Sequence, residues 1–445
     1  MRIAWFTPYS RKSAIARFSA AVVRELARQE TVDLWYPRTG DPLAAEVHNV
    51  SFRDASEVDS QKLAAYDLLV YNLGNHLPFH REIYEVSRRF PGLCVMHDFV
   101  MHHFFAAYYL EHLRRPQAYV AIMRRCAGAR GASVAEEIVT GRRRPVWETD
   151  EVTRYALFEE AIRGAYGVVA HSEFFRRHVE AVSPVPCARL YLPYELMPVK
   201  SGFSRQELGI PDSKLLLITI GHVNPNKRVP SVLQALAANR DLLERIVYVV
   251  AGPCDPGRLA ELESIISRLG LEGIVRLTGY VEEGPLQAYL RHADLCINLR
   301  FPAIEGASAS LVEEMLHGKA VIVTDTGFYS ELPSDCVMKI RPEHEQEDLT
   351  SALRRLVTDA GLREAIGSRA REFAEKHFRA DQYAREFLKF AWEVRSARPL
   401  LELVDRVAGE LKCMGVTKEM QIVDTVSREC EQLFCAGPEP WTGSG

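Results

Sequence analysis

Several features that would assign a protein to a special class are missing from this sequence. Its 445 residues carry 55 Lys and Arg against 59 Asp and Glu, so the net charge is −4 and the basic excess of a nucleic-acid-binding protein is absent. No stretch approaches the roughly 18 consecutive apolar residues that a membrane-spanning helix needs. The apolar start over residues 1–6 is too short for a secretion signal. These absences predict a cytoplasmic protein without a nucleic-acid partner.

Paired cysteines are missing as well. The nine cysteines are an odd number, and no two of them have the Cys-x-x-Cys spacing of redox and metal sites. Cys296 lies within an apolar run, as expected of a buried, reduced thiol. Neither a disulfide framework nor a cysteine-based metal site is therefore expected.

The sequence does contain a rhythm of short apolar runs separated by longer amphipathic stretches, which is typical of parallel α/β proteins. Its apolar fraction of 47% and charged fraction of 26% are those of ordinary globular proteins. The apolar runs fall into two series. The predicted strands are residues 3–6, 32–36, 68–71, 93–96 and 168–171 in the first series, and residues 215–220, 246–251, 275–278, 295–299 and 320–324 in the second.

The length suits two domains, and a proline-bearing segment between the two series marks their boundary. We expect an α/β protein with two Rossmann-like, doubly wound domains that face each other across a cleft. Ligands of such sheets bind at the carboxyl ends of the strands, so the cleft is the default site. Pro399 is expected to end the helix before it. The predicted divisions are an N-terminal domain over 1–195, a linker over 196–213, a second domain over 214–378, a helix over 379–398 that packs back on the first domain, and a helical extension with a flexible tail over 399–445.

Two glutamates follow a predicted strand in the segment 299–318. Glu305 and Glu313 are separated by seven residues, and Ser308 or Ser310 can cap a helix that begins between them. Glu305 then lies in a loop and Glu313 on the second turn of the helix, so both carboxylates can face one pocket. Carboxylates accept pairs of hydrogen bonds, which suits the vicinal hydroxyls of a sugar or a ribose. Glutamate pairs are also common on exposed helix faces, and the pair alone favours that simpler interpretation.

A second motif follows the first strand of the second series. Gly221 lets the backbone come close to a ligand, and Lys227 and Arg228 can neutralise phosphate charge. A helix predicted to begin near Val229 adds the N-terminal amides that bind anions. A basic pair in a loop is more often solvated surface. Together with two glutamates at the same sheet edge, however, it predicts a ligand that contains a diphosphate and a sugar.

In their order and spacing, these motifs resemble the retaining glycosyltransferases of family 4, which have the GT-B fold. In the first half of the chain, the likeness is to a bacterial, polysaccharide-type branch of that family. The likeness extends over about residues 1–395 of the sequence. The residues that carry it are Gly221, Lys227, Arg228, Glu305, Glu313, the segment 318–327 with Glu331, and the segments 13–19, 71–76 and 91–103.

The resemblance implies an enzyme that moves a sugar, with retention of configuration, from a nucleotide-diphosphate sugar to a saccharide or lipid-linked acceptor. It further implies that His97 faces the transferred sugar and that Glu305 lies near it, so these two are the candidate catalytic residues. The residues implied in donor binding are Lys227 and Arg228 at the diphosphate, Glu313 at the ribose, Val281 at the base, and Gly221 and Ser308 beside them.

The chain departs from the family pattern at two positions. Ala14 stands where the family usually has a glycine, so its Cβ narrows the approach to phosphates and acceptor. Glu305 and Gly306 stand where this branch usually has a Gly-Glu pair. The role of Glu305 therefore depends on the register, which the distance from Glu313 to Gly318 supports.

Metal and cofactor are not expected to take part. The Asp-x-Asp motif that holds a divalent metal in some glycosyltransferases does not occur in the sequence, so fixed cations would stabilise the departing diphosphate instead. His97, Asp98, His102 and His103 lie close enough in sequence to suggest a metal site. Adjacent histidines point in different directions on a helix, however, and no metal ligands are predicted. Two alternatives remain: a nucleotide-sugar epimerase or hydrolase on the same fold, and a catalytically silent partner protein that only binds the nucleotide sugar.

Residues 113–145 contain eight arginines against only Glu136 and Glu137. A solvated helical hairpin would explain them, and so would a site for an anionic, lipid-linked acceptor at the inner membrane surface. Aromatic residues suited to base stacking are sparse in this segment, which argues against nucleic acid. The arginines expected to make a peripheral membrane contact are Arg114, Arg115, Arg124, Arg125, Arg142, Arg143 and Arg144.

Overall fold

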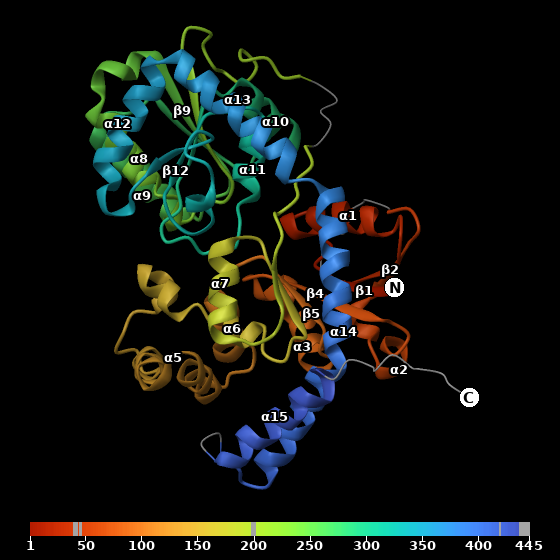
Figure 1. Cartoon of the computed structure of the whole chain (residues 1–445). Coiled ribbons are helices and arrows are strands. Elements are labelled where there is room, and N and C mark those ends of the chain that lie inside the picture. Colours follow the sequence, from red (N-terminus) through yellow and green to blue (C-terminus); the bar gives the residue numbers. More distant parts are fainter. Residues whose placement is uncertain (39–42, 44–46, 197–201, 418–419, 436–445) are drawn as a thin grey trace.

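A computed structural model gives the structure of residues 1–38, 43, 47–196, 202–417 and 420–435. The chain forms two parallel β-sheets, each in its own α/β domain, and a long C-terminal helix joins them along one side (Figure 1). The predicted fold class is therefore confirmed. In the described chain, no helix combines the length and apolar character needed to cross a membrane.

The N-terminal sheet has seven strands in the order β3-β2-β1-β4-β5-β6-β7. Successive residues of β1 belong to different apolar clusters, with Ile3 and Trp5 on one face and Ala4 and Phe6 on the other, so helices cover both faces of the sheet. Its strands are β1 Arg2–Phe6, β2 Thr31–Tyr36, β3 Val50–Asp54, β4 Leu68–Leu73, β5 Leu93–Met96, β6 Gly167–Ala170 and β7 Cys187–Arg189. Its helices are α1 Ala14–Leu26, α2 Ser60–Leu63, α3 Leu77–Arg89, α4 His102–Ala106, α5 Pro116–Val139, α6 Phe158–Ala161 and α7 Glu173–Val182.

The C-terminal sheet has six parallel strands in the order β10-β9-β8-β11-β12-β13. The order reverses between β8 and β11, so this neighbouring pair forms the switch point at which ligands of such sheets bind. Its strands are β8 Leu215–Ile220, β9 Ile246–Ala251, β10 Val275–Gly279, β11 Leu295–Asn298, β12 Val321–Thr324 and β13 Met338–Ile340. Its helices are α8 Val229–Ala238, α9 Pro256–Leu269, α10 Glu283–His292, α11 Ala309–Leu316, α12 Glu345–Thr358 and α13 Ala360–His377.

All ten strands predicted from apolar runs are present, while β3, β7 and β13 were not predicted. Short segments of 3-10 and π-helix complete the chain. The 3-10 segments are η1 Ala55–Glu57, η3 Val146–Glu148, η4 Asp150–Tyr155, η5 Pro225–Lys227, η6 Arg240–Arg245, η7 Gly327–Glu331 and η8 Pro342–His344, and the π-helical segment is η2 Ala107–His112.

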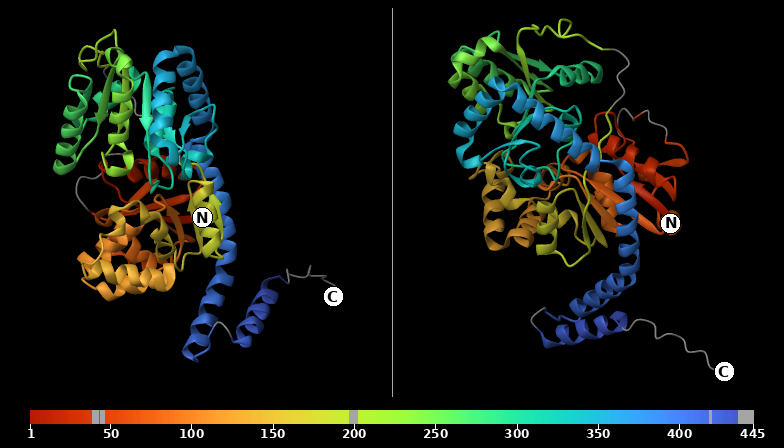
Figure 2. Two further views of the ribbon diagram at one scale, coloured as in Figure 1. Left: turned by 90° about the vertical axis from the view of Figure 1, so that its left-hand side faces the viewer. Right: turned by 45° about the horizontal axis from the view of Figure 1, so that its top comes forward.

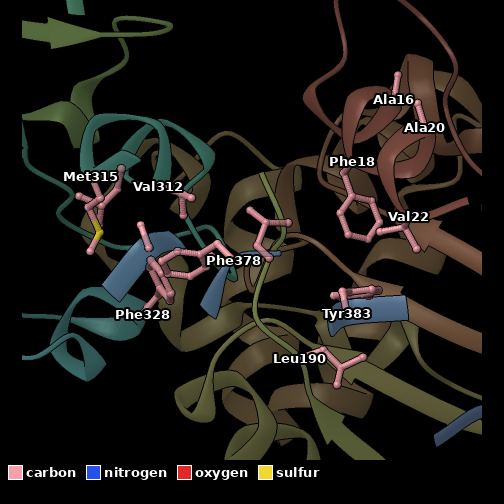
Figure 3. Close-up of a cluster of buried hydrophobic side chains, with 14 of the residues drawn as sticks. Ala16, Phe18, Ala20, Val22, Leu190, Val312, Met315, Phe328, Phe378 and Tyr383 are labelled. Atoms are coloured by element: carbon pink, nitrogen blue, oxygen red, sulfur yellow. The ribbon is translucent and has the colours of Figure 1, made fainter. Parts of the chain in front are cut away.

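Helix α14, Ala380–Cys413, returns from the C-terminal domain to the N-terminal one. Its first turns pack on α1, where the ring of Tyr383 lies 5.3 Å from that of Phe18 (Figure 3). The ring of Phe387, also on α14, lies 5.3 Å from that of Trp5 on β1. These contacts belong to an apolar cluster that extends from α1 to α11 and η7, so buried apolar surface couples the two domains.

The expected break at Pro399 is wrong, because α14 continues through this residue. A proline inside a helix leaves the carbonyl four residues earlier, that of Arg395, without its amide partner. Pro399 is exposed, so water can satisfy that carbonyl. Beyond it, α14 and α15, Gln421–Cys435, form a hairpin that extends away from both sheets (Figure 2).

Candidate active site between the two sheets

The segment after β5 meets the loop after β11 where the two domains face each other. The amide of Gly306 donates a hydrogen bond to the carbonyl of His97 over 2.9 Å, and the amide of Val100 donates to the carbonyl of Ile304 over 2.9 Å. Asp98 and Glu305 form an antiparallel bridge between these two bonds. A Cβ at Gly306 would lie 3.0 Å from the His97 carbonyl, so a larger residue would press the segments apart. The fold therefore brings together the two candidate catalytic residues, which lie far apart in sequence.

His97 is a buried, neutral histidine. Its Nε2 lies 3.1 Å from Oδ1 of Asn72 on β4, and the amide nitrogen of Asn72 donates to the carbonyl of Phe6 over 2.9 Å. Since that second bond orients the Asn72 amide, we assign the proton of His97 to Nε2. Burial, followed by the nearby His171, lowers the pKa of His97 well below its ordinary value. The ring is therefore uncharged and offers Nδ1 as a hydrogen-bond acceptor.

Asp98 is partly buried beside His97 and accepts a hydrogen bond from the amide of Asn75 over 2.7 Å. The pKa of Asp98 is raised to about 7, mainly by burial and further by the carboxylate of Glu305, while the hydrogen bond from the Asn75 amide acts in the opposite direction. A carboxyl group that titrates near neutrality thus lies at the contact between the domains.

Glu305 lies in the loop before α11, as predicted, but its carboxylate is held by its own domain. Arg300 contacts Oε1 of Glu305 through Nε at 2.8 Å, and the hydroxyl of Tyr329 donates to the same oxygen over 2.5 Å. Arg300 is only 8% exposed, so this is a nearly dry ion pair. The expected place of Glu305 beside the donor sugar stays a prediction.

Gly221 directly follows β8 in a conformation that favours glycine. Its φ is +88°, and a Cβ there would lie 3.1 Å from Nζ of Lys227. Lys227 is 4% exposed and donates from Nζ to the carbonyl of Ile220. Burial, and then the charge of Arg300, lowers its pKa well below the ordinary lysine value, while Glu314 and Glu305 act in the opposite direction. A buried amine therefore lies directly under the Gly221 loop.

Arg228 differs from its neighbour Lys227. Helix α8 begins at Val229, as expected, and Arg228 immediately precedes it with a φ of +56°. Its guanidinium binds Glu345 of α12 through Nε and Nη2 over 2.9–3.1 Å. Of the predicted basic pair, Lys227 thus lies at the carboxyl edge of β8, while Arg228 is bound to α12. The second buried cation near Lys227 is Arg300.

Helix α11 begins as predicted, because the hydroxyl of Ser308 accepts from the amide of Leu311 and caps the helix. Glu313 lies on its second turn and is 5% exposed. Gln287 of α10 donates to Glu313, and so does the hydroxyl of Tyr194. Burial raises the pKa of Glu313 despite these two bonds. The carboxylate is therefore held in place from two sides, and the ribose contact expected of it stays a prediction.

The residue expected at the base lies between β10 and α10. Val281 is partly buried against the main apolar cluster. Tyr280 beside it is 77% exposed, and Gly279 pairs with Gly252 at the end of β9. Ala14 is exposed at the first position of α1, whose cap Ser13 makes no side-chain hydrogen bond.

The histidines that suggested a metal site are used elsewhere. His102 binds the carbonyl of Tyr155 at 2.6 Å and the hydroxyl of Tyr119 at 2.8 Å. His103 contacts the amide nitrogen of Asn75 at 3.0 Å. Within the ranges that the structure describes, no three His, Cys, Asp or Glu side chains are arranged to hold a metal ion.

The arginine-rich segment forms α5 and the turns after it, and much of its charge is paired. Arg125 contacts the buried Glu160 at 2.5 Å, and Arg144 contacts Glu148 at 3.2 Å. Arg143 binds two carboxylates, and Arg124 lies 3.9 Å from that of Glu136. Three of these acceptors (Glu148, Glu151 and Glu160) lie outside residues 113–145, which is why counting charges within that window exaggerated the excess. The exposed arginines Arg114, Arg115 and Arg142 have no carboxylate within 4 Å among the described side chains.

Four residues at this site were missed from the sequence: Asn72, Tyr194, Arg300 and Glu314. Arg300 and Glu314 adjoin positions that were considered, Leu299 at a strand end and Glu313 on the helix. A basic residue directly after a strand, at the predicted ligand edge, was a usable signal for Arg300. Tyr194 carried no such signal, because its partner Glu313 is distant in sequence. Asn72 lies in the segment 71–76 that carries the family resemblance, but nothing there indicated its bond to His97, which is 25 residues away.

Comparison with known proteins agrees with this arrangement. Residues 201–373 match the family model described as "Glycosyl transferases group 1", so the C-terminal domain carries a group 1 glycosyltransferase sequence. The resemblance to a glycosyltransferase family that the motifs predicted is confirmed for this part of the chain. The match includes Gly221, Lys227, Glu305 and Glu313 but ends before α14 and leaves the N-terminal domain outside.

Two curated relatives also match only part of the chain. The D-inositol 3-phosphate glycosyltransferase of Streptomyces bingchenggensis is 29% identical over 181 residues, which is 39% of each chain. The lipopolysaccharide glucosyltransferase WaaG of Escherichia coli is 26% identical over 184 residues, 41% of this chain and 47% of that one. The chain thus matches less than half the length of these relatives.

Solved structures match over a larger part of the chain. The Anabaena protein Alr3699/HepE, solved in complex with UDP and glucose, superimposes with a TM-score of 0.60 at 17% identity, covering 88% of this chain and all of that one. This likeness, together with the two parallel sheets, identifies the fold as GT-B.

Proposed function

We propose that this protein is a retaining, metal-independent glycosyltransferase that moves a sugar from a nucleotide-diphosphate sugar to a saccharide or lipid-linked acceptor. The observation that carries the proposal is the edge formed by β8 and β11. Lys227 lies there under the Gly221 loop, and Glu313 is held on α11 by Gln287. An amine and a fixed carboxylate at the switch point of a parallel sheet suit a diphosphate and a ribose. The solved HepE complex contains UDP and glucose, which supports a donor of this class.

The residues at the domain contact define the expected chemistry. As the sugar leaves the diphosphate, negative charge grows on the phosphate oxygens, and a fixed cation such as Lys227 stabilises it. Neutral His97 would accept a hydrogen bond from a sugar hydroxyl at Nδ1. Glu305 is bound by Arg300 and Tyr329, which makes it a poor nucleophile. That supports reaction on one face of the sugar rather than through a covalent sugar–enzyme intermediate.

Turnover of a nucleotide-sugar donor tests this proposal. The full chain is incubated with UDP-, GDP-, ADP- and TDP-sugars and a panel of saccharide acceptors, and proton NMR follows the anomeric configuration of donor and product. We expect one donor to be consumed with retention, at a rate that EDTA leaves unchanged. Lys227→Ala should lower kcat at least about 100-fold, and Glu364→Ala, at an exposed position of α13, should have no effect. Inversion, or undiminished turnover in Lys227→Ala, would contradict the proposal.

A catalytically silent partner protein is the second candidate, and two observations favour it. Both predicted diphosphate cations are already bound within the chain, Lys227 to the Ile220 carbonyl and Arg228 to Glu345. Ala14 moreover replaces a glycine at the start of α1. Such a protein would bind a nucleotide sugar without consuming it. An epimerase or hydrolase would instead consume the donor with no acceptor present, so comparing reactions with and without acceptor separates all three functions.

For the acceptor, we propose that the N-terminal domain reaches an anionic membrane surface through Arg114, Arg115 and Arg142. These side chains are exposed, whereas Arg124, Arg125, Arg143 and Arg144 have carboxylates nearby. Sedimentation with phosphatidylglycerol vesicles should fall with rising salt, because screening weakens such contacts. Changing Arg114, Arg115 and Arg142 together to Glu should abolish it. Equal sedimentation with phosphatidylcholine vesicles would contradict the electrostatic contact.

A further inference from the structure

Lys227 belongs to a buried group of four charged side chains, which we call the β8–β11 charge cluster. Its members are Lys227 after β8, Arg300 and Glu305 after β11, and Glu314 on α11. Lys227, Arg300 and Glu314 are 4%, 8% and 0% exposed. Two cations face two carboxylates, so the cluster is neutral when all four groups are ionised. Neutrality matters because an unbalanced charge in such a dry place is costly.

The cluster divides into two pairs. Arg300 and Glu305 are in direct contact at 2.8 Å. Glu305 receives a further bond from Tyr329, so this pair is complete. Lys227 has its one hydrogen bond to a backbone carbonyl, although an ammonium group can donate three. The carboxylate left to balance its charge is that of Glu314.

Glu314 is unusual because only half of its carboxylate is used. Asn298 donates to Oε2 over 2.9 Å and also to the hydroxyl of Ser310. The other oxygen, Oε1, is buried without a hydrogen-bond partner in the described structure. A buried, unsatisfied acceptor on a fully enclosed carboxylate costs free energy, and the charge of Lys227, which acts on this carboxylate without a direct contact in the described structure, offsets part of that cost.

We propose that Glu314 is a positioning residue that keeps Lys227 charged and ready to contact the donor diphosphate. The inference rests on the proposed function, because it assigns the diphosphate to Lys227. Glu314 touches neither donor nor acceptor in this account, and it acts only through the amine. Its neighbour Glu313, with its own partners Gln287 and Tyr194, serves the ribose instead.

The electrostatics have the required sign. Burial and Arg300 both lower the pKa of Lys227, while Glu314 and then Glu305 raise it. Burial raises the pKa of Glu314 to about 8, against the opposing effects of the hydrogen bond from Asn298 and of the charge of Lys227. Without Glu314, two of the three remaining charges would be positive, and Lys227 would lose its proton at a lower pH. The charged and titratable groups that face this pair are Arg300, Glu305, Glu313 and Cys296.

The test is the pH dependence of diphosphate binding to the full chain. Inorganic pyrophosphate and UDP are titrated between pH 6 and pH 9 into wild type, Glu314→Gln and Glu314→Asp. Gln has the shape of Glu and can keep the hydrogen bond from Asn298, but it carries no charge. Asp keeps the negative charge, but its side chain is one methylene group shorter. We expect Glu314→Gln to bind almost like wild type at the lowest pH and to weaken progressively as pH rises. The loss of affinity should approach roughly tenfold for each unit by which the pKa of Lys227 falls in the variant.

The variants separate this role from a structural one. Glu314→Asp should keep a pH profile close to that of wild type, even if it melts at a lower temperature. Glu364→Gln, on the exposed side of α13, serves as the control for loss of a carboxylate. An unchanged profile in Glu314→Gln, or equal weakening at every pH, would overturn the inference while leaving the proposed function intact. If wild type binds neither of the two probes and none of GDP, ADP and TDP, both this inference and the proposed function are overturned.

Discussion

Asp98 is a residue whose protonation should depend visibly on the fold. Its folded-state pKa of about 7 lies above the roughly 3.9 of an unfolded aspartate. Between these values the folded chain binds more protons than the unfolded one, so the contribution of Asp98 to stability falls as pH rises from about 4 to about 7. Above pH 7 the contribution is constant. The expected slope is about 1.4 kcal/mol per pH unit within that window.

Urea unfolding of wild type and Asp98→Asn at pH 5, 6, 7 and 8 checks this sign. Asparagine does not titrate, so the stability of wild type relative to the variant should decline up to about pH 7 and then stay constant. Two curves that remain parallel from pH 5 to pH 7 would mean that Asp98 is already ionised in the folded protein.

Gly252 should be the glycine least able to accept a side chain. A Cβ there would lie 2.1 Å from the carbonyl oxygen of Gly221, so the loop under the donor site would have to move. Gly252→Ala should cost about 1–3 kcal/mol of stability and weaken nucleotide binding. Gly257→Ala is the matched control, since a Cβ at Gly257 meets no atom within 4 Å. Thermal melting with and without nucleotide measures both effects, and equal behaviour of the two variants would refute the steric explanation.

Which residues of the site could be predicted depends on how local their signals are. Ser308 and Glu313 were found because a cap and the helix that it begins are neighbours in sequence, and Lys227 because it follows a strand and a glycine. Arg300 and Glu314 belong to the same short segments, but their importance comes from burial and from each other's charge. Such balance arises only when β8, β11 and α11 are packed together, and no spacing in the sequence encodes it.

At the scale of elements, α14 has two parts with different roles. Up to Val394 it buries many side chains against α1 and β1, and Val394 itself packs on Gly167 of β6. Of the side chains described between residues 400 and 429, none is buried. The sequence predicted a helix over 379–398 that packs back on the first domain. The sequence did not predict that the helix continues through Pro399. The helix tolerates this proline because Pro399 is exposed and water can satisfy the carbonyl that loses its amide partner.

This difference predicts the effect of shortening the chain. Removing residues 400–445 should leave the melting temperature and nucleotide binding almost unchanged, because it loses mainly the packing of the partly buried Leu401 on the apolar cluster and the bond from Tyr166 to Glu402, the latter worth about 1 kcal/mol. Removing residues 380–445 should expose Trp5 and Phe18 and give an aggregating or unfolded protein. A large loss of stability in the first truncation would show that the C-terminal hairpin contributes to the folded core.

At the scale of the whole molecule, a carboxylate from one domain caps a helix of the other. Glu331 of η7 accepts hydrogen bonds from the amides of Glu173 and Phe174 over 2.8 Å and 2.5 Å at the start of α7. Such a charged cap stabilises a helix end by about 1–2 kcal/mol. Glu331→Ala should therefore loosen the contact between the domains, lowering the melting temperature and raising the radius of gyration in X-ray scattering. A variant with both values unchanged would show that the other interdomain contacts suffice.

The two-domain organisation was the most predictable level, because strand rhythm and length are properties of long segments. The contact between the domains was the least predictable. It rests on single bonds such as that from Gly306 to the carbonyl of His97, which join residues more than 200 positions apart. The resemblance to a known family indicated that His97 and Glu305 belong to one site, whereas the ion pair of Glu305 with Arg300 emerged only from the fold.

The central claim is that a nucleotide diphosphate binds at the β8–β11 edge, on Lys227 and Glu313. The most direct measurement is a thermal-shift titration of the full chain with UDP, GDP, ADP and TDP, repeated on Glu313→Ala. A ligand that binds only the folded state raises the melting temperature by mass action. We expect one of the four nucleotides to stabilise the wild type and the shift to be lost in the variant. No shift with any of them, or an equal shift in Glu313→Ala, would contradict it.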